Sequence, residues 1–349
     1  MTGLRVNPAH LPEFRPRRYL ANGHLQTIVG NYLPRRGVLP QAEAHLVEVS
    51  PSREGGQAAS QVLCHCHWQP GPQRASAHTA LIVHGLEGSS SSQYVLGNAA
   101  KLWAAGCNVI RMNMRNCGNT EHLTPTLYHS GLSGDVRCVL QHFLDLYSLE
   151  SIALIGYSMG GNLVLKLAGE YGATPPPQLC AIATVSPAVD LGPSADALHR
   201  SFNRLYEQKF LRALLRRFRR KVALYPRAYH PGRAIGIGSL REFDDRITAF
   251  YSGFSSAEDY YHRAAAARVL HQITVPTLIL HALDDPFIVL TPQTRAAIVA
   301  NPAITLQEAA HGGHCAFLAA PHAAQQYDGY WAEHTLLGFL HRHAKAAAL

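Results

Sequence analysis

Apolar runs and helix-like stretches alternate along most of the chain. Continuous apolar runs such as 79–85 and 151–156 are typical of buried strands, whereas 133–148 has apolar residues at helical spacing. Strands are predicted in this way at 45–50, 60–68, 79–85, 107–114, 151–156, 179–186, 275–283 and 303–308. Helices are predicted at 93–105, 133–148, 159–172, 292–300 and 322–343. This alternation implies an α/β fold with a mostly parallel, doubly wound sheet and helices on both faces.

The alternation breaks between two late strands, over residues 189–268. This stretch is charged and helical with several glycine and proline interruptions, so we expect a helical lid inserted into the sheet fold. The chain has 349 residues, which is more than one compact core usually holds, although single α/β domains with insertions reach this size. We therefore expect one domain over 1–349, with an N-terminal arm at 1–40 and the lid at 189–268.

The positive charge of the chain is concentrated in one segment. Residues 200–221 hold nine Lys or Arg side chains and one acid, Glu207. The net charge of this segment, +8, equals the net charge of the whole chain. Apolar residues recur in this segment close to helical spacing, so it is predicted to be a basic amphipathic helix. A solvated helix face is the favoured interpretation, and weak contact with anionic lipid head groups, or contact with an acidic partner, is the alternative. We expect no nucleic-acid partner, because no nucleic-acid motif accompanies these cations.

Composition and cysteine usage bear on where the protein works. With 47% hydrophobic and 15% charged residues, the chain has the composition of a globular, soluble protein. The first residues, "MTGLRVNPAHLPEFRPRRYL", lack the apolar core of a signal peptide, and no apolar run is long enough to span a membrane. Seven scattered cysteines do not form a disulfide framework. We therefore expect a cytoplasmic protein.

The stretch "GYSMG" at 156–160 fits the pattern G-x-S-x-G between a predicted strand and a predicted helix. In this motif the serine sits on a sharp turn and projects above the sheet, so Ser158 is the predicted nucleophile. An oxyanion that forms there needs two backbone N–H donors. We expect one from Met159, which follows the nucleophile, and one from Leu86 in the glycine turn "HGLEG" at 84–88.

A serine nucleophile needs a base, and the base needs an acid to orient it. The glycine-rich stretch "AAHGGHCAF" at 309–317 follows the last predicted strand and offers His311 and His314, of which we choose His314. The stretch "LHALDDPFIV" at 280–289 ends the preceding strand with two aspartates. Asp285 is preferred because an acid, a proline and then apolar residues are the usual form of this loop; Asp284 is the alternative, and Asp190 is a weaker third candidate.

Together these motifs make the chain resemble the α/β-hydrolase superfamily and, more narrowly, the YheT-like hydrolases. The resemblance covers residues 10–340. It rests on "NGHLQTI" (22–28), "HGLEGSSSSQY" (84–94), "RNCGNT" (115–120), "YHSGLSGDVR" (128–137), "GYSMGGN" (156–162), "FDDRIT" (243–248), "DDPF" (284–287) and "HGGHCAF" (311–317). The resemblance implies the α/β-hydrolase fold and an esterase-like enzyme with a Ser-Asp-His triad.

The predicted function is a serine hydrolase that cleaves small-molecule carboxylic esters with short- to medium-chain acyl groups, through an acyl-enzyme intermediate. An acyltransferase with the same triad and an alcohol acceptor is the alternative, and a non-catalytic ligand-binding protein of this fold is a third. We expect no cofactor and no metal. The stretch "CHCH" at 64–67 does not change this expectation, because in a strand it places only two ligands on each face.

Overall fold

In the computed structural model, eight strands form one sheet in the order β1-β2-β4-β3-β5-β6-β7-β8. The structure describes residues 13–35, 37–52, 58–71, 73–322 and 327–344. The strands are β1 Glu43–Ser50, β2 Ser60–His67, β3 Thr79–Val83, β4 Asn108–Met112, β5 Ile152–Tyr157, β6 Leu179–Val185, β7 Thr277–Ala282 and β8 Ile304–Ala309. Pairs β1–β2 and β2–β4 are antiparallel, and the other neighbours are parallel. The predicted α/β class with a mostly parallel sheet is confirmed.

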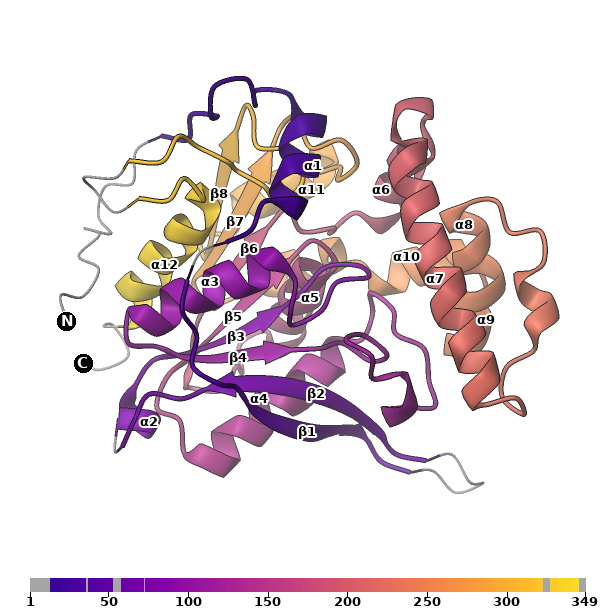
Figure 1. The fold of residues 1–349 in the computed structure, drawn as a ribbon, viewed down its shortest axis with the longest axis horizontal. Coiled ribbons are helices and arrows are strands. Elements are labelled where there is room, and N and C mark those ends of the chain that lie inside the picture. Colours follow the sequence, from indigo (N-terminus) through magenta and orange to yellow (C-terminus); the bar gives the residue numbers. More distant parts are fainter. Residues whose placement is uncertain (1–12, 36, 53–57, 72, 323–326, 345–349) are drawn as a thin grey trace.

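Helices cover both faces of the sheet (Figure 1). Alternate residues of the buried strands point to opposite faces, so each strand contributes to two apolar layers. One layer packs α3 and α12 against the sheet, and the other packs α4, α5 and α11. The helices around the sheet are α1 Gly23–Tyr32, α2 Gln73–Ser76, α3 Gln93–Ala104, α4 Ser133–Tyr147, α5 Met159–Tyr171, α11 Pro292–Ala300 and α12 Trp331–Ala344.

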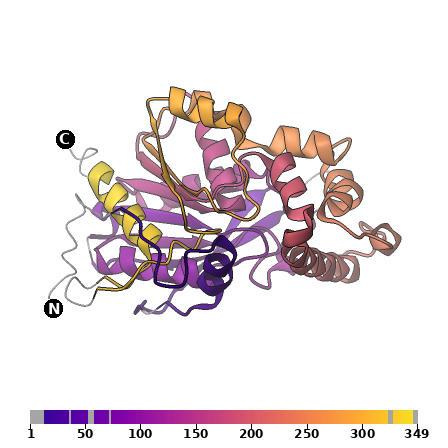
Figure 2. The ribbon, with the colours of Figure 1, turned by 90° about the horizontal axis from the view of Figure 1, so that it is seen from above.

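Between β6 and β7 the chain leaves the sheet and forms a group of helices, here called the cap. The cap comprises α6 Leu191–His199, α7 Arg204–Leu224, α8 Leu240–Phe243, the π-helical segment η4 Asp244–Ala249, α9 Phe250–Ser252 and α10 Ala257–Ala264. Figures 1 and 2 both show these helices together at one end of the molecule, beside the sheet. The cap lies within the predicted insertion at 189–268, and its predicted role as a lid stays a prediction.

The register of the parallel strands brings several loops to one edge of the sheet. Gly156 near the end of β5 pairs with Val83 of β3 and Thr184 of β6, and Val185 pairs with Leu280 of β7. The loops that follow β3, β5, β6 and β7 therefore begin at nearly the same level, on the side where the cap lies. Open α/β sheets bind ligands at the carboxyl ends of their strands, which is the edge formed here.

One predicted helix starts in the wrong place. The pattern predicts a last helix over 322–343, but α12 begins at Trp331. Isolated antiparallel bridges join Leu318 to Tyr330 and His322 to Tyr327 instead. The backbone N–H of Ala319 also donates to the carbonyl of Gly329, whose φ of 89° suits a turn rather than a helix. These antiparallel contacts therefore replace the first turns of the predicted helix. Residues 323–326 lie outside the described residues.

Candidate active site

Ser158 occupies a sharp turn between β5 and α5. Its backbone φ of 53° and ψ of −117° lie in a region that residues other than glycine rarely adopt. Neighbouring glycines make the turn possible, because a Cβ on Gly160 would collide with the carbonyl oxygens of Val83 and His84. The packing around the turn therefore holds Ser158 in a strained conformation at the end of β5, as in a nucleophile elbow.

The two predicted oxyanion donors lie beside this turn. Leu86 and Met159 line the same cavity as Ser158, and Met159 is the first residue of α5. Within the described part of the chain, neither backbone N–H donates a hydrogen bond, which leaves both available to a ligand. The loop that carries Leu86 is fixed by its neighbour, since the Gly85 N–H donates to Tyr94 Oη at 2.9 Å. The helix N-terminus adds a favourable potential for negative charge at this point.

His314 and Asp285 form a hydrogen-bonded ion pair. His314 Nδ1 lies 2.8 Å from Asp285 Oδ2, and the Asp285 side chain is fully buried. The other carboxylate oxygen, Oδ1, accepts from the N–H groups of Phe287 at 3.1 Å and Ile288 at 2.9 Å. Burial acts to raise the pKa of Asp285, but His314 and the N–H of Ile288 outweigh it and the pKa is lowered. Asp285 is therefore an ionised acceptor that holds the imidazole in one orientation.

The other ring nitrogen of His314, Nε2, is linked to the Ser158 turn through the side chain of Cys315. His314 Nε2 lies 3.6 Å from Cys315 Sγ, and the carbonyl of Val185 accepts both from Cys315 Sγ at 3.5 Å and from the Ser158 N–H at 3.0 Å. No hydrogen bond joins Ser158 to His314 in this structure. Catalytic hydrogen bonds are often long before substrate binds. Burial acts to lower the pKa of His314, but the Cys315 sulfur and the Asp285 carboxylate outweigh it and raise it above the ordinary value.

The alternative candidates have structural contacts of their own. Asp284 Oδ1 accepts from the N–H of Gly313 at 2.8 Å, so Asp284 fixes the loop that carries His314. Asp190 accepts from the N–H of Thr291 at 2.9 Å and from the Thr294 hydroxyl at 2.8 Å, at the N-terminus of α11. His311 is about half exposed and lies 3.5 Å from Asp284. The structure thus pairs the predicted base, His314, with the predicted acid, Asp285, whereas Asp284 contacts the backbone of the same loop and Asp190 contacts the start of α11.

The motif "NGHLQTI" supports the histidine loop, a role that the sequence did not reveal. These residues begin α1, and the N–H of His314 donates to Thr27 Oγ1 at 2.8 Å. Gln26 exchanges hydrogen bonds with the backbone of Leu318, its Oε1 accepting at 2.8 Å and its Nε2 donating at 3.1 Å. Contact is so close that a Cβ on Gly313 would collide with the carbonyl oxygen of Gly23. The motif was visible, but only the fold shows that it contacts residues nearly 300 positions later.

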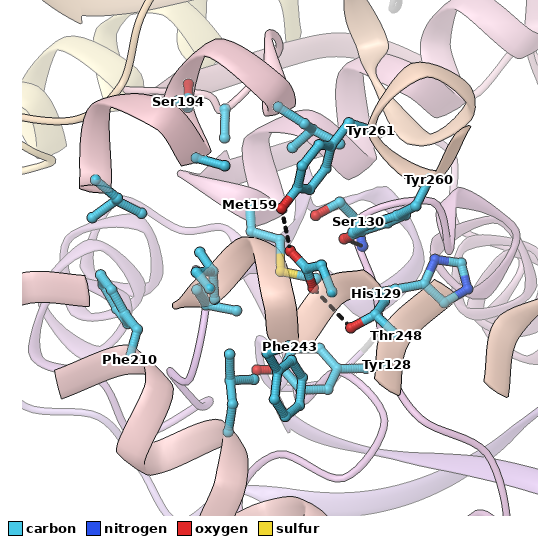
Figure 3. Close-up of a pocket in the computed structure, with 18 of the residues that line it drawn as sticks. Tyr128, His129, Ser130, Met159, Ser194, Phe210, Phe243, Thr248, Tyr260 and Tyr261 are labelled. Atoms are coloured by element: carbon cyan, nitrogen blue, oxygen red, sulfur yellow. Dashed lines mark hydrogen bonds between the residues drawn. The ribbon is translucent and has the colours of Figure 1, made fainter. Parts of the chain in front are cut away.

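A largely apolar pocket extends from Ser158 into the cap (Figure 3). It encloses about 930 Å³ of empty space including its open mouth. Its apolar lining comes from both the cap and the loops of the sheet edge, and includes Leu86, Leu127, Met159, Leu191, Leu198, Phe210, Leu214, Phe218, Leu240, Phe243, Phe287 and Ile288. A pocket with this lining is typical of sites for small, mostly apolar ligands.

The basic segment 200–221 attaches the cap to the sheet body at one end. Arg217 of α7 forms ion pairs with Glu87 at 2.8 Å and with Glu121 at 3.2 Å. Lys221 is fully buried and donates to the backbone carbonyl of Glu121 at 3.1 Å, and burial lowers its pKa to about 7. The prediction of a solvated face is therefore wrong for Arg217 and Lys221. Because Glu87 lies next to Leu86, this contact also joins the cap to the predicted oxyanion loop.

Other sequence-based expectations concern metals and membranes. Across the residues that the structure describes, no cluster of three or more His, Cys, Asp or Glu side chains is arranged to hold a metal ion. In "CHCH", Cys64 and Cys66 are buried in the core, while His65 binds Ser90 and His67 binds Arg111. None of the described helices has the length and apolar character needed to cross a membrane.

Comparison with known proteins agrees with this architecture. The profile of the family described as alpha/beta hydrolase fold matches residues 81–321. YheT of Escherichia coli (strain K12), which has the word esterase in its name, is 30% identical over 313 residues, covering 88% of this chain and 87% of YheT. Phospholipase ABHD3 of Mus musculus is 31% identical over 244 residues, which span 69% of this chain and 58% of that protein. The Pyrococcus furiosus esterase Pf2001 shares the fold, with a TM-score of 0.51 at 14% identity, over 88% of this chain and 98% of that one. The chain therefore belongs to the α/β-hydrolase superfamily and, within it, to the YheT-like hydrolases.

Proposed function

We propose that the protein is a serine hydrolase that cleaves carboxylic esters. The observation that supports the proposal is the link from the hydrogen-bonded His314–Asp285 pair, through Cys315 and the Val185 carbonyl, to the strained turn of Ser158, which lines an apolar pocket. The names of its relatives YheT, with the word esterase, and phospholipase ABHD3 support ester cleavage. The apolar lining of the pocket favours an acyl chain as the group that is bound.

In the proposed reaction, Ser158 Oγ attacks the ester carbonyl carbon as its proton passes to His314 Nε2. The carbonyl oxygen becomes an oxyanion and accepts hydrogen bonds from the N–H groups of Leu86 and Met159. When the tetrahedral intermediate collapses, the carbon–oxygen bond to the alcohol breaks and His314 returns the proton to the departing alcohol. Water then repeats the sequence on the acyl-enzyme, which releases the carboxylic acid and restores Ser158.

Asp285 acts on His314 and takes no proton in this scheme. It holds the Nδ1–H of the ring and stabilises the imidazolium that forms in each half-reaction. The raised pKa makes the neutral ring of His314 a stronger proton acceptor, and only this neutral form can take the serine proton. For His314 Nε2 to reach Ser158 Oγ, the imidazole has to exchange its contact with Cys315 Sγ for one with the serine.

The cap forms much of the pocket wall, so we also propose that it gates access to Ser158. The predicted contact of 200–221 with anionic lipid head groups stays a prediction. Near the start of this segment, Phe202 and Leu205 are 87% and 84% exposed. Exposed apolar groups beside cations are typical of surfaces that contact lipid.

The proposal is tested by hydrolysis of p-nitrophenyl butyrate by purified Ser158→Ala. We expect the variant to fold with an unchanged thermal midpoint and to lose at least about 10⁴-fold in kcat, because it lacks the attacking oxygen. Cys315→Ala is the matched control, since it removes the other nucleophile near His314 Nε2, and it should keep most of the activity. Full activity in Ser158→Ala would disprove the proposal.

A further inference from the structure

Asp244 is a buried carboxyl in the wall of the pocket that the proposed reaction does not use. It is the first residue of the π-helical segment η4, it is 9% exposed, and it lines the same cavity as Ser158. Its Oδ1 accepts from the Thr248 hydroxyl at 2.8 Å and its Oδ2 accepts from the Tyr261 hydroxyl at 2.8 Å. Both donors also line the cavity, and Figure 3 shows their hydrogen bonds as dashed lines.

The charge of Asp244 has no partner of opposite sign in direct contact. Among the residues that the structure describes, no Lys, Arg or His forms an ion pair with it. Arg217, the cationic side chain in the lining, is held by Glu87 at 2.8 Å. His129 also lines the pocket, but burial lowers its pKa to about 3, so its ring is neutral. The carboxyl of Asp244 therefore faces an apolar cavity with two hydroxyl groups as its only described hydrogen-bond donors.

This environment leaves Asp244 with unused capacity to accept hydrogen bonds. A carboxylate offers about four lone-pair sites, and Thr248 and Tyr261 occupy two of them. Burial raises the pKa of Asp244 to about 6, so the group is mostly ionised at pH 7.5 although it is poorly solvated. A buried acceptor of this kind gains most from a ligand that brings a donor into the cavity, since water solvates it poorly there.

We propose that Asp244 is a specificity-determining residue that binds a hydrogen-bond donor, a hydroxyl or an ammonium group, on the substrate. The substrate class is then an ester that is mostly apolar but carries such a donor several bonds away from the reacting carbonyl. The apolar walls take the hydrocarbon part, and Asp244 selects among esters of similar length by the presence of the donor. This inference rests on the proposed ester hydrolysis and names the substrates of the same site.

The test uses matched esters that differ only in the donor. On the acyl side they are the p-nitrophenyl esters of hexanoic, 6-hydroxyhexanoic and 6-aminohexanoic acid. On the alcohol side they are propyl butyrate and glycerol monobutyrate. We expect at least one donor-bearing ester to have a kcat/KM about tenfold to a hundredfold above that of its plain counterpart, as for a hydrogen bond to a charged group. The donor-bearing ester that is preferred over its plain counterpart identifies the kind of donor and shows whether the acyl or the alcohol side carries it.

Three variants connect the preference to Asp244. Asp244→Leu should remove the preference and raise kcat/KM for the plain ester, because an apolar side chain takes the place of the charged acceptor. Asp244→Asn keeps the size and one acceptor oxygen, so it should reduce the preference and abolish it for the ammonium ester. Asp245→Asn is the matched control, because it removes the same charge from the exposed neighbouring residue of η4, and it should keep the preference.

The outcomes separate this inference from the proposed function. Labelling of Ser158 by a fluorophosphonate and hydrolysis of any of these esters report on the proposed function alone. If the wild-type enzyme hydrolyses the plain esters but prefers no donor-bearing one, the assignment of Asp244 is overturned while the hydrolase stands. A preference that survives in both Asp244→Leu and Asp244→Asn would overturn it as well. If Asp244→Leu fails to fold, the preference measured in Asp244→Asn still tests the assignment, because an unreduced preference in that variant would overturn it.

Discussion

The sheet edge and the cap each bring one buried aspartate to the site, and the two carboxyl groups are held in different ways. Asp285, after β7, has an imidazole as its partner and backbone N–H groups around it, and its pKa is lowered. Asp244, in the cap, has two hydroxyl groups as its donors among the described residues, and burial raises its pKa to about 6. Both carboxyl groups are almost completely buried. The groups that contact each carboxyl, and not the extent of its burial, therefore decide whether its ionised or its protonated form is favoured.

The difference corresponds to two uses of a buried acid. A carboxylate that is fully paired in the free protein is suited to a fixed task, which at Asp285 is the orientation of His314. A carboxylate that lacks a charged partner is suited to bind a group that arrives with the ligand, as we propose for Asp244. The following predictions test whether the two acids can be told apart in this way.

The largest effect is expected at the sheet edge. Asp285→Asn should lower kcat for p-nitrophenyl butyrate by about 10³–10⁴-fold, because the imidazole loses both its orientation and the charge that stabilises its cation. Asp284→Asn is the matched control, since its amide oxygen can still accept from the Gly313 N–H, and it should lose less than about tenfold. Equal losses in the two variants would mean that Asp285 has no special role.

The pH dependence of kcat/KM sharpens the contrast. His314 acts as a base only when it is neutral, and its pKa is raised above the ordinary value of 6.5. Activity should therefore fall as the pH is lowered through a value above 6.5, by about tenfold per pH unit below it. In Asp285→Asn the residual activity should show this limb at a lower pH, because the carboxylate no longer stabilises the cation. If kcat/KM falls at the same pH in the wild type and in Asp285→Asn, the pairing of His314 with Asp285 is contradicted.

A smaller effect is expected from α1, which positions the histidine loop. Thr27→Val removes the oxygen that accepts from the N–H of His314, and it should lower kcat by about tenfold with little change in KM. Thr27→Ser keeps the hydroxyl and should recover most of the loss. If Thr27→Val lowers only the thermal midpoint and not kcat, then α1 has a structural role alone.

The smallest effect concerns stability at Asp244. A carboxyl whose pKa rises from 3.8 to about 6 on folding binds its proton more tightly in the folded state, so protonation between these pH values favours folding. Asp244→Asn removes this contribution. The thermal midpoint of the variant relative to the wild type should therefore fall by about 1–3 °C between pH 7.5 and pH 5. A constant difference across this range would show that Asp244 does not titrate as described.

The two regions also differ in how far the sequence predicts them. Around the sheet, buried apolar runs locate β5 to within one residue, since 151–156 is predicted and Ile152–Tyr157 is found. The helix at 292–300 coincides with Pro292–Ala300, where Thr291 and a proline mark the start. These signals are local, so a single sequence shows them.

What the sequence does not show depends on contacts between distant segments. Helical periodicity in the cap says nothing about which face meets Ser158, so Asp244 stayed an unexplained part of "FDDRIT". The burial of Arg217 and Lys221 depends on residues that are about a hundred positions away. The contact of Thr27 with the His314 loop spans 287 positions. Periodicity identifies an element, but it does not identify what the element packs against.

The central claim is that Ser158, activated by the His314–Asp285 pair, is the nucleophile. It is tested most directly by treating the wild-type protein with a fluorophosphonate and locating the modified residue by peptide mass spectrometry. The account predicts stoichiometric modification of Ser158, no modification in Ser158→Ala, and strongly slowed modification in Asp285→Asn. Modification of another residue such as Cys315, or none at Ser158 in folded protein, would contradict it.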